Sequence, residues 1–336
     1  MRVLIFRPGA LGDALLALPA LALLRGAAPH PHITLVARAD ILPLARAAGL
    51  ADETWDFDLP CWSALWQVGA RLRSPAVEAL RGADAAIAWC ADDGALTRSL
   101  RAHGVREVVV APGRPPASRD GDRACPGDTH TALYLARTLG PLLPGGPPVT
   151  IHALPSIAED LARAADATTA EATLAGLALP PGRIVALHPG SGGDAKRWPA
   201  ERFATTARRL LEASYAPLLL SGPADDVAIE GTTAGLGTDA GRVPVARGLP
   251  LAALVGVLRR CLAYLGNDSG VSHLAGLAGT PTLALFGPTD PAVWAPLGAR
   301  VRVLRATAHA PDAVPAMASL SVERVWQALC GLMAAP

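Results

Sequence analysis

One glycine-rich stretch holds the only lysine of the chain. Residues 188–199 read HPGSGGDAKRWP, and Lys196 is the single lysine among 30 basic residues. Gly190 and Gly192 free the backbone to bring N–H groups close to an anion, and Ser191 adds a hydroxyl donor. A compact ammonium group beside such a loop suits a phosphate. The stretch lacks the GKS or GKT of a Walker motif, which disfavours ATP hydrolysis.

A second polar cluster lies in residues 262–296, which read LAYLGNDSGVSHLAGLAGTPTLALFGPTDPAVWAP. The pattern predicts a strand, a polar turn, a helix and a second buried strand. Asp268, Ser269 and Gly270 form the turn, and His273 lies in the first helical turn. Unpaired N–H groups and the macrodipole at a helix start favour an anion. This turn is therefore a candidate phosphate site.

A third cluster, RPGALGD at residues 7–13, follows the first predicted strand. Asp13 begins a helix, so it is either a helix-capping residue or a general base that takes a proton from a hydroxyl nucleophile. A dinucleotide fingerprint is disfavoured, because GxGxxG is missing and the second predicted strand ends in Arg38 rather than in an acid. Arg7, Gly12 and Asp13 are the candidate residues here.

A weaker signal is the pair Asp225 and Asp226, in SGPADD after another predicted strand. One of these carboxylates is a candidate to accept hydrogen bonds from ribose hydroxyls. The alternative, that one of them caps the next helix, is equally favoured.

Apolar runs alternate between strand and helix patterns along the chain, which predicts parallel sheets covered on both faces. The length of 336 residues favours two domains, and a proline- and glycine-rich stretch at 141–155 is the expected connection. A cleft between two such sheets is the expected ligand site. The predicted strands are residues 3–6, 33–36, 85–89, 106–110, 184–187, 217–220, 262–265 and 282–286, and the predicted helices are 12–24, 42–48, 129–139, 157–177, 200–213, 225–236, 251–260, 271–277 and 322–333.

Composition excludes several classes of function. The formal net charge of +1 gives no basic field for nucleic acid. Five cysteines, odd in number and without a CxxC pair, indicate reduced thiols in a cytoplasmic protein without a zinc site. The glycines and the carboxylate within residues 9–13 oppose a signal peptide, and no apolar run reaches the roughly 18 residues of a membrane span.

Three motifs in this order, GALGD, PGSGGDAKRWP and NDSGVSHLAGLAGTPTLALFGPTDPAVWAP, resemble family 9 glycosyltransferases, the group of ADP-heptose lipopolysaccharide heptosyltransferases. The similarity runs from the first strand to the last helix, and residues 128–140 also resemble a family helix. The resemblance implies the α/β GT-B fold of two Rossmann-like domains. The expected parts are an acceptor-binding domain at 1–155, a donor-binding domain at 156–320, and a last helix at 321–336 that packs back on the first domain.

The resemblance also implies roles for individual residues. Asp13 matches the proposed catalytic base, and Lys196 the donor-binding lysine. Arg7 and Gly12 flank the base on the acceptor side. The implied donor-binding residues are Gly190, Ser191, Gly192, Lys196, Asp268 near the donor sugar, Ser269, Gly270 and His273 beside the diphosphate, and either Asp225 or Asp226 at the nucleotide.

The family implies an inverting, metal-independent transfer with no cofactor, in which a nucleotide sugar, ADP-heptose, is the co-substrate. The expected acceptor is a glycan or glycolipid such as the lipopolysaccharide inner core, and arginines near positions 71, 73 and 112–123 either bind it or lie on a solvated face. We expect a cytoplasmic protein, peripheral to the inner face of the membrane, with no nucleic-acid partner and no obligate protein partner. Two alternatives are a sugar-nucleotide epimerase of the same fold and a catalytically silent glycan-binding protein.

Overall fold

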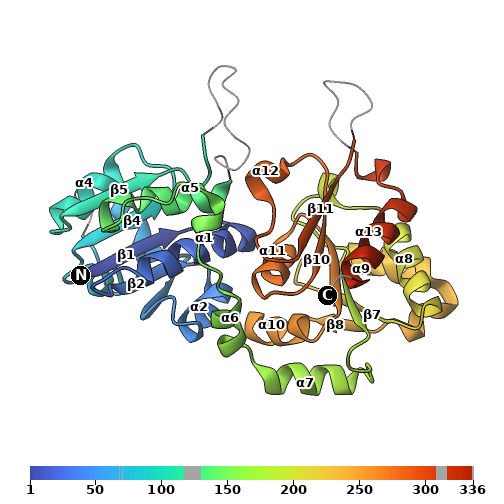
Figure 1. The fold of residues 1–336 in the computed structure, drawn as a ribbon. Helices are drawn as coiled ribbons and strands as arrows, with labels where there is room; N and C mark the ends of the chain where they lie inside the picture. Colours follow the sequence, from blue (N-terminus) through green and yellow to red (C-terminus); the bar gives the residue numbers. More distant parts are fainter. Residues whose placement is uncertain (68, 70, 117–129, 308–315, 335–336) are drawn as a thin grey trace. The chain divides into compact units, whose positions relative to one another are not determined.

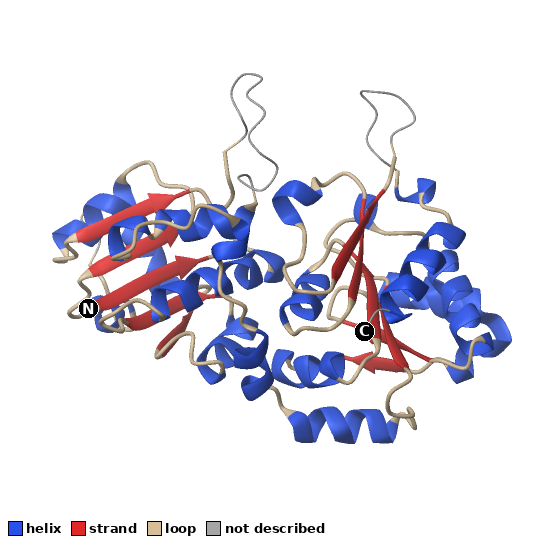
Figure 2. Ribbon diagram, viewed as in Figure 1, coloured by secondary structure: helices blue, strands red, loops and turns tan. Residues whose placement is uncertain are grey.

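The structure of the protein is a computed structural model that describes residues 1–67, 69, 71–116, 130–307 and 316–334. The chain divides into two compact units, Met1–Arg163 and Ala164–Pro336 (Figure 1). Each unit has a sheet with helices on its faces (Figure 2). The first unit ends at Arg163, a few residues after the boundary expected at 155. The proline- and glycine-rich stretch 141–155 therefore belongs to the first unit.

The sheet of the first unit is entirely parallel and has the strand order β3-β2-β1-β4-β5. β1 and β4 are central, and nearly all their residues are buried, as expected for a parallel sheet covered on both faces. The chain reverses its winding direction between β1 and β4, which is where such sheets bind ligands. The strands are β1 (Arg2–Arg7), β2 (His32–Ala37), β3 (Glu53–Asp56), β4 (Ala85–Trp89) and β5 (Glu107–Ala111).

Aromatic side chains fill much of the core under this sheet. Trp62 lies in a short helical stretch, contacts Phe6 edge-on with 5.6 Å between ring centroids, and donates from its indole nitrogen to the carbonyl of Asp56. Leu65 is fully buried beside it. These two side chains are therefore packing residues rather than ligand contacts. The helices of this unit are α1 (Leu11–Arg25), α2 (Leu42–Ala47), α3 (Ala76–Leu80), α4 (Ala95–Ala102), α5 (Thr131–Thr138) and α6 (Ala158–Ala164), the last of which ends at the division.

The sheet of the second unit is also parallel, in the order β11-β10-β9-β6-β7-β8. Its switch point lies between β6 and β9, which pair directly. The strands are β6 (Ile184–His188), β7 (Ala216–Ser221), β8 (Val245–Arg247), β9 (Ala263–Asn267), β10 (Thr282–Phe286) and β11 (Val301–Arg305). The helices are α7 (Ala167–Gly176), α8 (Ala200–Glu212), α9 (Asp226–Leu236), α10 (Leu251–Arg259), α11 (Gly270–Leu277), α12 (Pro291–Trp294) and α13 (Val322–Ala334).

The last helix contributes to the core of the second unit. The buried face of α13 belongs to this core, and its packing on the first domain stays a prediction of the family resemblance. In the core of the second unit, Val325, Ala328 and Leu329 pack with side chains of α8, β9 and β10. These apolar residues at positions i, i+3 and i+4 form one helical stripe that removes the edge of this core from water.

One expected helix is broken in two. Residues 157–177 form α6 and α7, and the break falls at Asp166, whose side chain accepts a hydrogen bond of 2.9 Å from the N–H of Thr169. An aspartate at this position is a good N-cap for a new helix. No helix among the described residues is long and apolar enough to cross a membrane.

Candidate functional site

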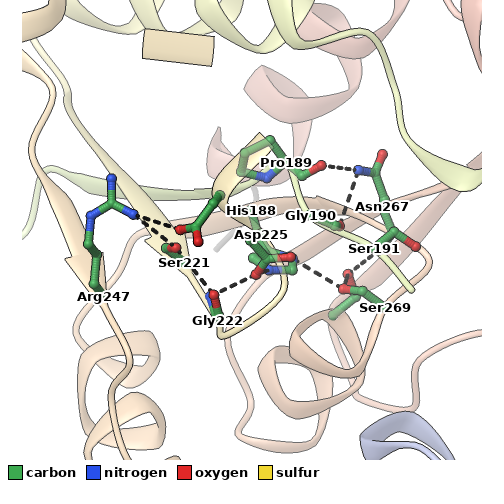
Figure 3. Close-up of polar contacts among 12 residues, drawn as sticks. His188, Pro189, Gly190, Ser191, Ser221, Gly222, Asp225, Arg247, Asn267 and Ser269 are labelled. Carbon is green, nitrogen blue, oxygen red and sulfur yellow. Dashed lines mark hydrogen bonds and ion pairs between the residues drawn. The ribbon is translucent and has the colours of Figure 1, made fainter. Parts of the chain in front are cut away.

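Asn267, the last residue of β9, connects the two loops that flank the switch point of the second sheet (Figure 3). Its side-chain amide donates to the carbonyls of Pro189 and Gly190 at 2.9 and 3.3 Å, and its oxygen accepts from the N–H of Trp198 at 2.9 Å. Asn267 is fully buried. Both ends of the glycine-rich stretch are thus tied to the neighbouring strand, which fixes the path of the loop.

Trp198 anchors the far end of the same loop. It is buried, lies edge-on to Phe203 with 5.1 Å between centroids, and donates from its indole nitrogen to the carbonyl of Leu320 at 2.8 Å. An indole that is packed and hydrogen-bonded in this way serves the fold.

Asp268 contacts or lies close to most of the polar side chains that the sequence patterns singled out. Its Oδ2 accepts from Lys196 Nζ at 2.8 Å and from Thr289 Oγ1 at 2.7 Å, and its carbonyl accepts from Ser191 Oγ at 2.9 Å. His273 Nε2 lies 4.0 Å from its Oδ1. The Asp268 side chain is 6% exposed and that of Lys196 is 34% exposed. The lysine is therefore held by a buried carboxylate while its ammonium group still reaches solvent.

A second buried carboxylate, Asp225, lies on the other side of the same loop. Its Oδ2 is 2.9 Å from His188 Nε2 and accepts from the N–H of Gly222 at 2.7 Å (Figure 3). Burial acts to raise the pKa of Asp225, but the hydrogen bond and charge of His188 and the N–H of Gly222 outweigh it, and the pKa is lowered. His188 Nδ1 lies 3.3 Å from Ser269 Oγ.

Gly190 passes directly over the Asp225 carboxylate. A Cβ at this position would lie 1.8 Å from Asp225 Oδ1, so only glycine fits. Gly192, two residues later, has no atom within 4 Å of such a Cβ. The two glycines of the predicted phosphate loop thus have different roles, one set by close packing and the other free of it.

The neighbouring carboxylate of Asp226 has a different environment. It is the first residue of α9, its side chain is 74% exposed, and it lies 3.5 Å from Arg247 Nη1. The two aspartates that the sequence could not separate are therefore distinct: Asp225 is engaged inside the protein, and Asp226 faces solvent.

Ser269 and Gly270 form the start of α11. Ser269 is the N-cap residue, with an extended backbone, yet its side chain makes no capping hydrogen bond. Gly270 is the first residue of the helix, and His273 is buried in its first turn. The Ser269 hydroxyl is thus not bonded to the first N–H groups of the helix, which sit at the switch point and favour an anion.

In the first unit, Asp13 lies in the first turn of α1 with its side chain 30% exposed. Its Oδ2 accepts from the N–H of Ala10 at 3.0 Å, so it does cap the helix. Arg7 is buried; its Nε donates to the carbonyl of Asp13 at 2.9 Å and its Nη2 lies 3.6 Å from Asp13 Oδ1. Burial lowers the pKa of Arg7, and the Asp13 charge opposes this shift. Gly12 lies beside Asp13 in the same turn.

Two of the hollows in the first unit are lined by arginines. One is at the carboxyl ends of β1, β2 and β3, and it is bordered by Pro8, Gly9, Arg38, Asp40, Phe57 and Asp58. The other is bordered by Arg71 and Arg73 together with Leu59, Pro60, Cys61 and Ala64. Both arginines are exposed. Residues 117–123 of the other arginine-bearing loop, and Asp128, lie outside the described residues.

Sequence patterns assigned no role to three residues of this site, His188, Asn267 and Thr289. His188 was visible as the polar end of a buried strand, and Thr289 as part of a turn at the same sheet edge. Among the described residues, no group of three or more His, Cys, Asp or Glu side chains is placed to hold a metal ion.

Comparison with known proteins now bears on this arrangement. Residues 152–318 match the family model of glycosyltransferase family 9 (heptosyltransferase). This segment is therefore similar to a family 9 glycosyltransferase domain. The Escherichia coli lipopolysaccharide heptosyltransferase 2 is 34% identical over 115 residues, which are 34% of this chain and 33% of that protein. The matched segment is thus about a third of the length of the curated relatives.

Solved structures show that the fold extends over the whole chain. The E. coli ADP-heptose lipopolysaccharide heptosyltransferase II has a TM-score of 0.73 at 21% identity, over 99% of this chain and 98% of that chain. The E. coli heptosyltransferase WaaC, solved with ADP, has a TM-score of 0.67 at 19% identity, over 99% and 100%. The predicted α/β GT-B fold with two Rossmann-like units is confirmed.

Proposed function

We propose that the protein is an inverting glycosyltransferase that transfers a sugar from an ADP-sugar, with ADP-heptose as the expected donor, to a hydroxyl group of a glycan or glycolipid such as the lipopolysaccharide inner core. The observation that carries this proposal is the cluster of Lys196, Ser191 and Asp268 at the switch point of the segment that is similar to a family 9 domain. The acceptor class comes from the relatives, which are lipopolysaccharide heptosyltransferases. A glycolipid acceptor would make the protein peripheral to the inner face of the membrane.

In the proposed donor site, the diphosphate is held by Lys196, Ser191 and the backbone of the loop from Gly190 to Gly192. The N–H groups at the start of α11, from Gly270 onward, face the same charge. These groups stabilise the negative charge that grows on the leaving diphosphate. Asp268 lies near the donor sugar and holds Lys196 beside the diphosphate, where His273 adds a donor.

For the nucleotide we favour Asp226 over Asp225 as the carboxylate that meets the ribose. Asp225 is buried and already accepts from His188 and Gly222. Asp226 is exposed at the helix start that follows β7. A carboxylate at that place in the fold is suited to ribose hydroxyls.

Asp13 is the proposed general base. The acceptor oxygen attacks the anomeric carbon in line, its proton passes to the Asp13 carboxylate, and the bond from that carbon to the phosphate oxygen breaks, so that ADP leaves with the electron pair. The single displacement inverts the anomeric centre. The hydrogen bond that the N–H of Ala10 donates holds the carboxylate in place, and its exposed part is open to a hydroxyl group.

The proposal is tested first by binding. We expect calorimetric titration of the whole protein to give a tighter Kd for ADP than for UDP or GDP, and saturating ADP to raise the Tm by mass action. Equal binding of all three would contradict the ADP-sugar donor. ADP-heptose with a glycolipid acceptor should then give ADP and an extended acceptor, with and without EDTA, since the lysine and helix start offset the charge that a metal would meet.

The alternatives make different products. A sugar-nucleotide epimerase would convert the donor without an acceptor, and a silent glycan-binding protein would release no ADP under any condition. Strict dependence on Mg²⁺ would contradict the metal-independent mechanism.

A further inference from the structure

His188 joins two loops through its two ring nitrogens. It is the last residue of β6, and its side chain is 4% exposed. Nε2 faces Asp225 of the β7–α9 loop at 2.9 Å, and Nδ1 faces Ser269 at the start of α11 at 3.3 Å (Figure 3). The proposed mechanism gives this buried histidine no role.

The bond to Asp225 fixes the ring. The Asp225 carboxylate only accepts hydrogen bonds, because its pKa is lowered despite its burial, the bond from His188 being the main cause that acts against burial. Nε2 therefore carries a hydrogen and donates to Asp225. This orientation turns Nδ1 toward Ser269, so the imidazole ring cannot leave Ser269 without losing its bond to a buried carboxylate.

Ser269 occupies the N-cap position of α11, but its side chain makes no capping hydrogen bond. Serine at this position ordinarily accepts a hydrogen bond from the second or third N–H of the helix, which satisfies one of the unpaired donors. Here the Ser269 side chain makes no such bond, and its hydroxyl lies 3.3 Å from His188 Nδ1 and 3.4 Å from Ser272 Oγ. An uncapped serine at the start of an anion-binding helix leaves the N–H groups to another acceptor.

We propose that His188 is a positioning residue of the donor site, which holds the Ser269 hydroxyl away from the first N–H groups of α11 and so keeps these groups open to the diphosphate of the nucleotide. The inference rests on the proposed function. It assigns Ser269 a different role from the one implied by the family resemblance: its hydroxyl is an internal competitor of the diphosphate, which His188 restrains.

The test uses ADP and the whole protein. A glutamine amide nitrogen mimics Nε2 of histidine, so His188→Gln keeps the bond to Asp225 and releases Ser269. The freed hydroxyl then caps α11 and competes with the ligand. An N-cap bond is worth about 1 kcal/mol, so we expect a roughly five-fold weaker Kd for ADP by calorimetry, with no loss of Tm.

The deciding variant is the double substitution His188→Gln with Ser269→Ala. Removal of the competing hydroxyl in this double variant should restore the wild-type Kd for ADP. If His188 had only a structural role, the double variant would bind no better than His188→Gln. If Ser269→Ala alone weakened ADP as much as His188→Gln, the hydroxyl would be a ligand contact. Either result overturns the proposal.

A matched variant tests the same point from the other nitrogen. An asparagine amide mimics Nδ1, so His188→Asn keeps Ser269 restrained and leaves Asp225 without its partner. We expect a lowered Tm with a wild-type Kd for ADP. Unchanged ADP binding in His188→Gln would overturn this inference alone, whereas a wild-type protein that binds no ADP would overturn the proposed function and the inference with it.

Discussion

The switch points of the two sheets carry carboxylates in opposite environments. In the second unit, Asp268 and Asp225 are buried, and each accepts from two or more donors. In the first unit, Asp13 has one backbone hydrogen bond and a guanidinium at 3.6 Å, and 30% of its side chain is exposed. The same fold element, a loop after a central parallel strand, thus gives a rigid polar network in one unit and an accessible carboxylate in the other.

The difference between buried and accessible carboxylates matches the two halves of the proposed glycosyl transfer. Stabilisation of a leaving diphosphate requires donors that are already in place, and buried networks with all groups satisfied provide that rigidity. A general base must meet a hydroxyl group and later release a proton, which requires access. Substitutions should therefore affect turnover in the first unit and donor binding or stability in the second.

The largest effect is expected at Asp13. Asp13→Asn keeps an oxygen to accept the N–H of Ala10 but cannot take a proton. We expect turnover to fall by at least about 100-fold, with an unchanged Kd for ADP and an unchanged Tm. On the same preparation, a steady-state transfer assay measures turnover, calorimetric titration measures the Kd and thermal unfolding measures the Tm.

Wild-type turnover in Asp13→Asn would show that Asp13 is only a helix cap. The first unit would then have no accessible catalytic carboxylate to contrast with the buried network of the second. Asp13→Ala is the matched control for the cap: it removes the oxygen as well, and should also lower the Tm because the N–H of the N-cap residue Ala10 loses its acceptor.

The second test compares alanine substitutions at two glycines of one loop. Gly190→Ala places a methyl group 1.8 Å from Asp225 Oδ1, whereas Gly192→Ala meets nothing within 4 Å. Overpacking of this kind costs about 1–3 kcal/mol, and the loop must also move. We expect Gly190→Ala to lower the free energy of unfolding in urea by about 2 kcal/mol and to weaken ADP binding.

Gly192→Ala should match the wild type in both measurements. Equal stability and equal ADP binding in Gly190→Ala and Gly192→Ala would show that the Asp225 carboxylate does not determine the position of the loop. The proposed contrast between the buried network of the second unit and the accessible Asp13 of the first would then be contradicted.

Sequence patterns predicted most central elements of this fold. Continuous apolar runs gave the buried strands β4 and β10 with their observed bounds, since a strand covered on both faces has no alternation to obscure it. The short edge strands β3, β8 and β11 were missed, because they are only partly buried and carry charged residues such as Glu53 and Arg305. The helix α13 was predicted from its amphipathic stripe, which shows that a helix packs but not on which core.

For the site, sequence placed the polar clusters at strand ends, and parallel topology brought Ser191, Lys196 and Asp268 together. The roles of His188 and Asn267 were not predictable, because they depend on partners 37 to 81 positions away in the chain. Asp225 and Asp226 are adjacent in sequence, and only the register of the helix start decides which of them is buried.

The third test concerns the single lysine. Lys196 donates to the buried Asp268, and the planar guanidinium of Lys196→Arg keeps the charge but not the geometry of that bond. We expect a roughly tenfold weaker Kd for ADP, the effect of one misplaced charge-assisted hydrogen bond, with turnover at saturating donor reduced as well. Wild-type binding and turnover would show that the site requires only charge at this position.

The smallest effect is a pH dependence that separates the adjacent aspartates. The pKa of Asp225 is lowered in the folded protein, so its ionised form stabilises the fold above the ordinary carboxyl pKa of about 3.9. That stability is lost as the pH falls through the lower, folded value. Asp225→Asn should therefore flatten the fall of Tm in acid, at a lower Tm near pH 7.

Asp226→Asn is the matched control, because its side chain is 74% exposed and its nearest cation, Arg247, lies 3.5 Å away. Salt bridges between exposed groups contribute little to stability. Thermal unfolding between pH 7 and pH 2.5 should give the wild-type acid profile for this variant. If the Tm of Asp225→Asn fell with pH as steeply as that of the wild type, the bond to His188 would not stabilise the fold. The buried carboxylates of the second unit would then contribute no more stability than the exposed Asp13 of the first.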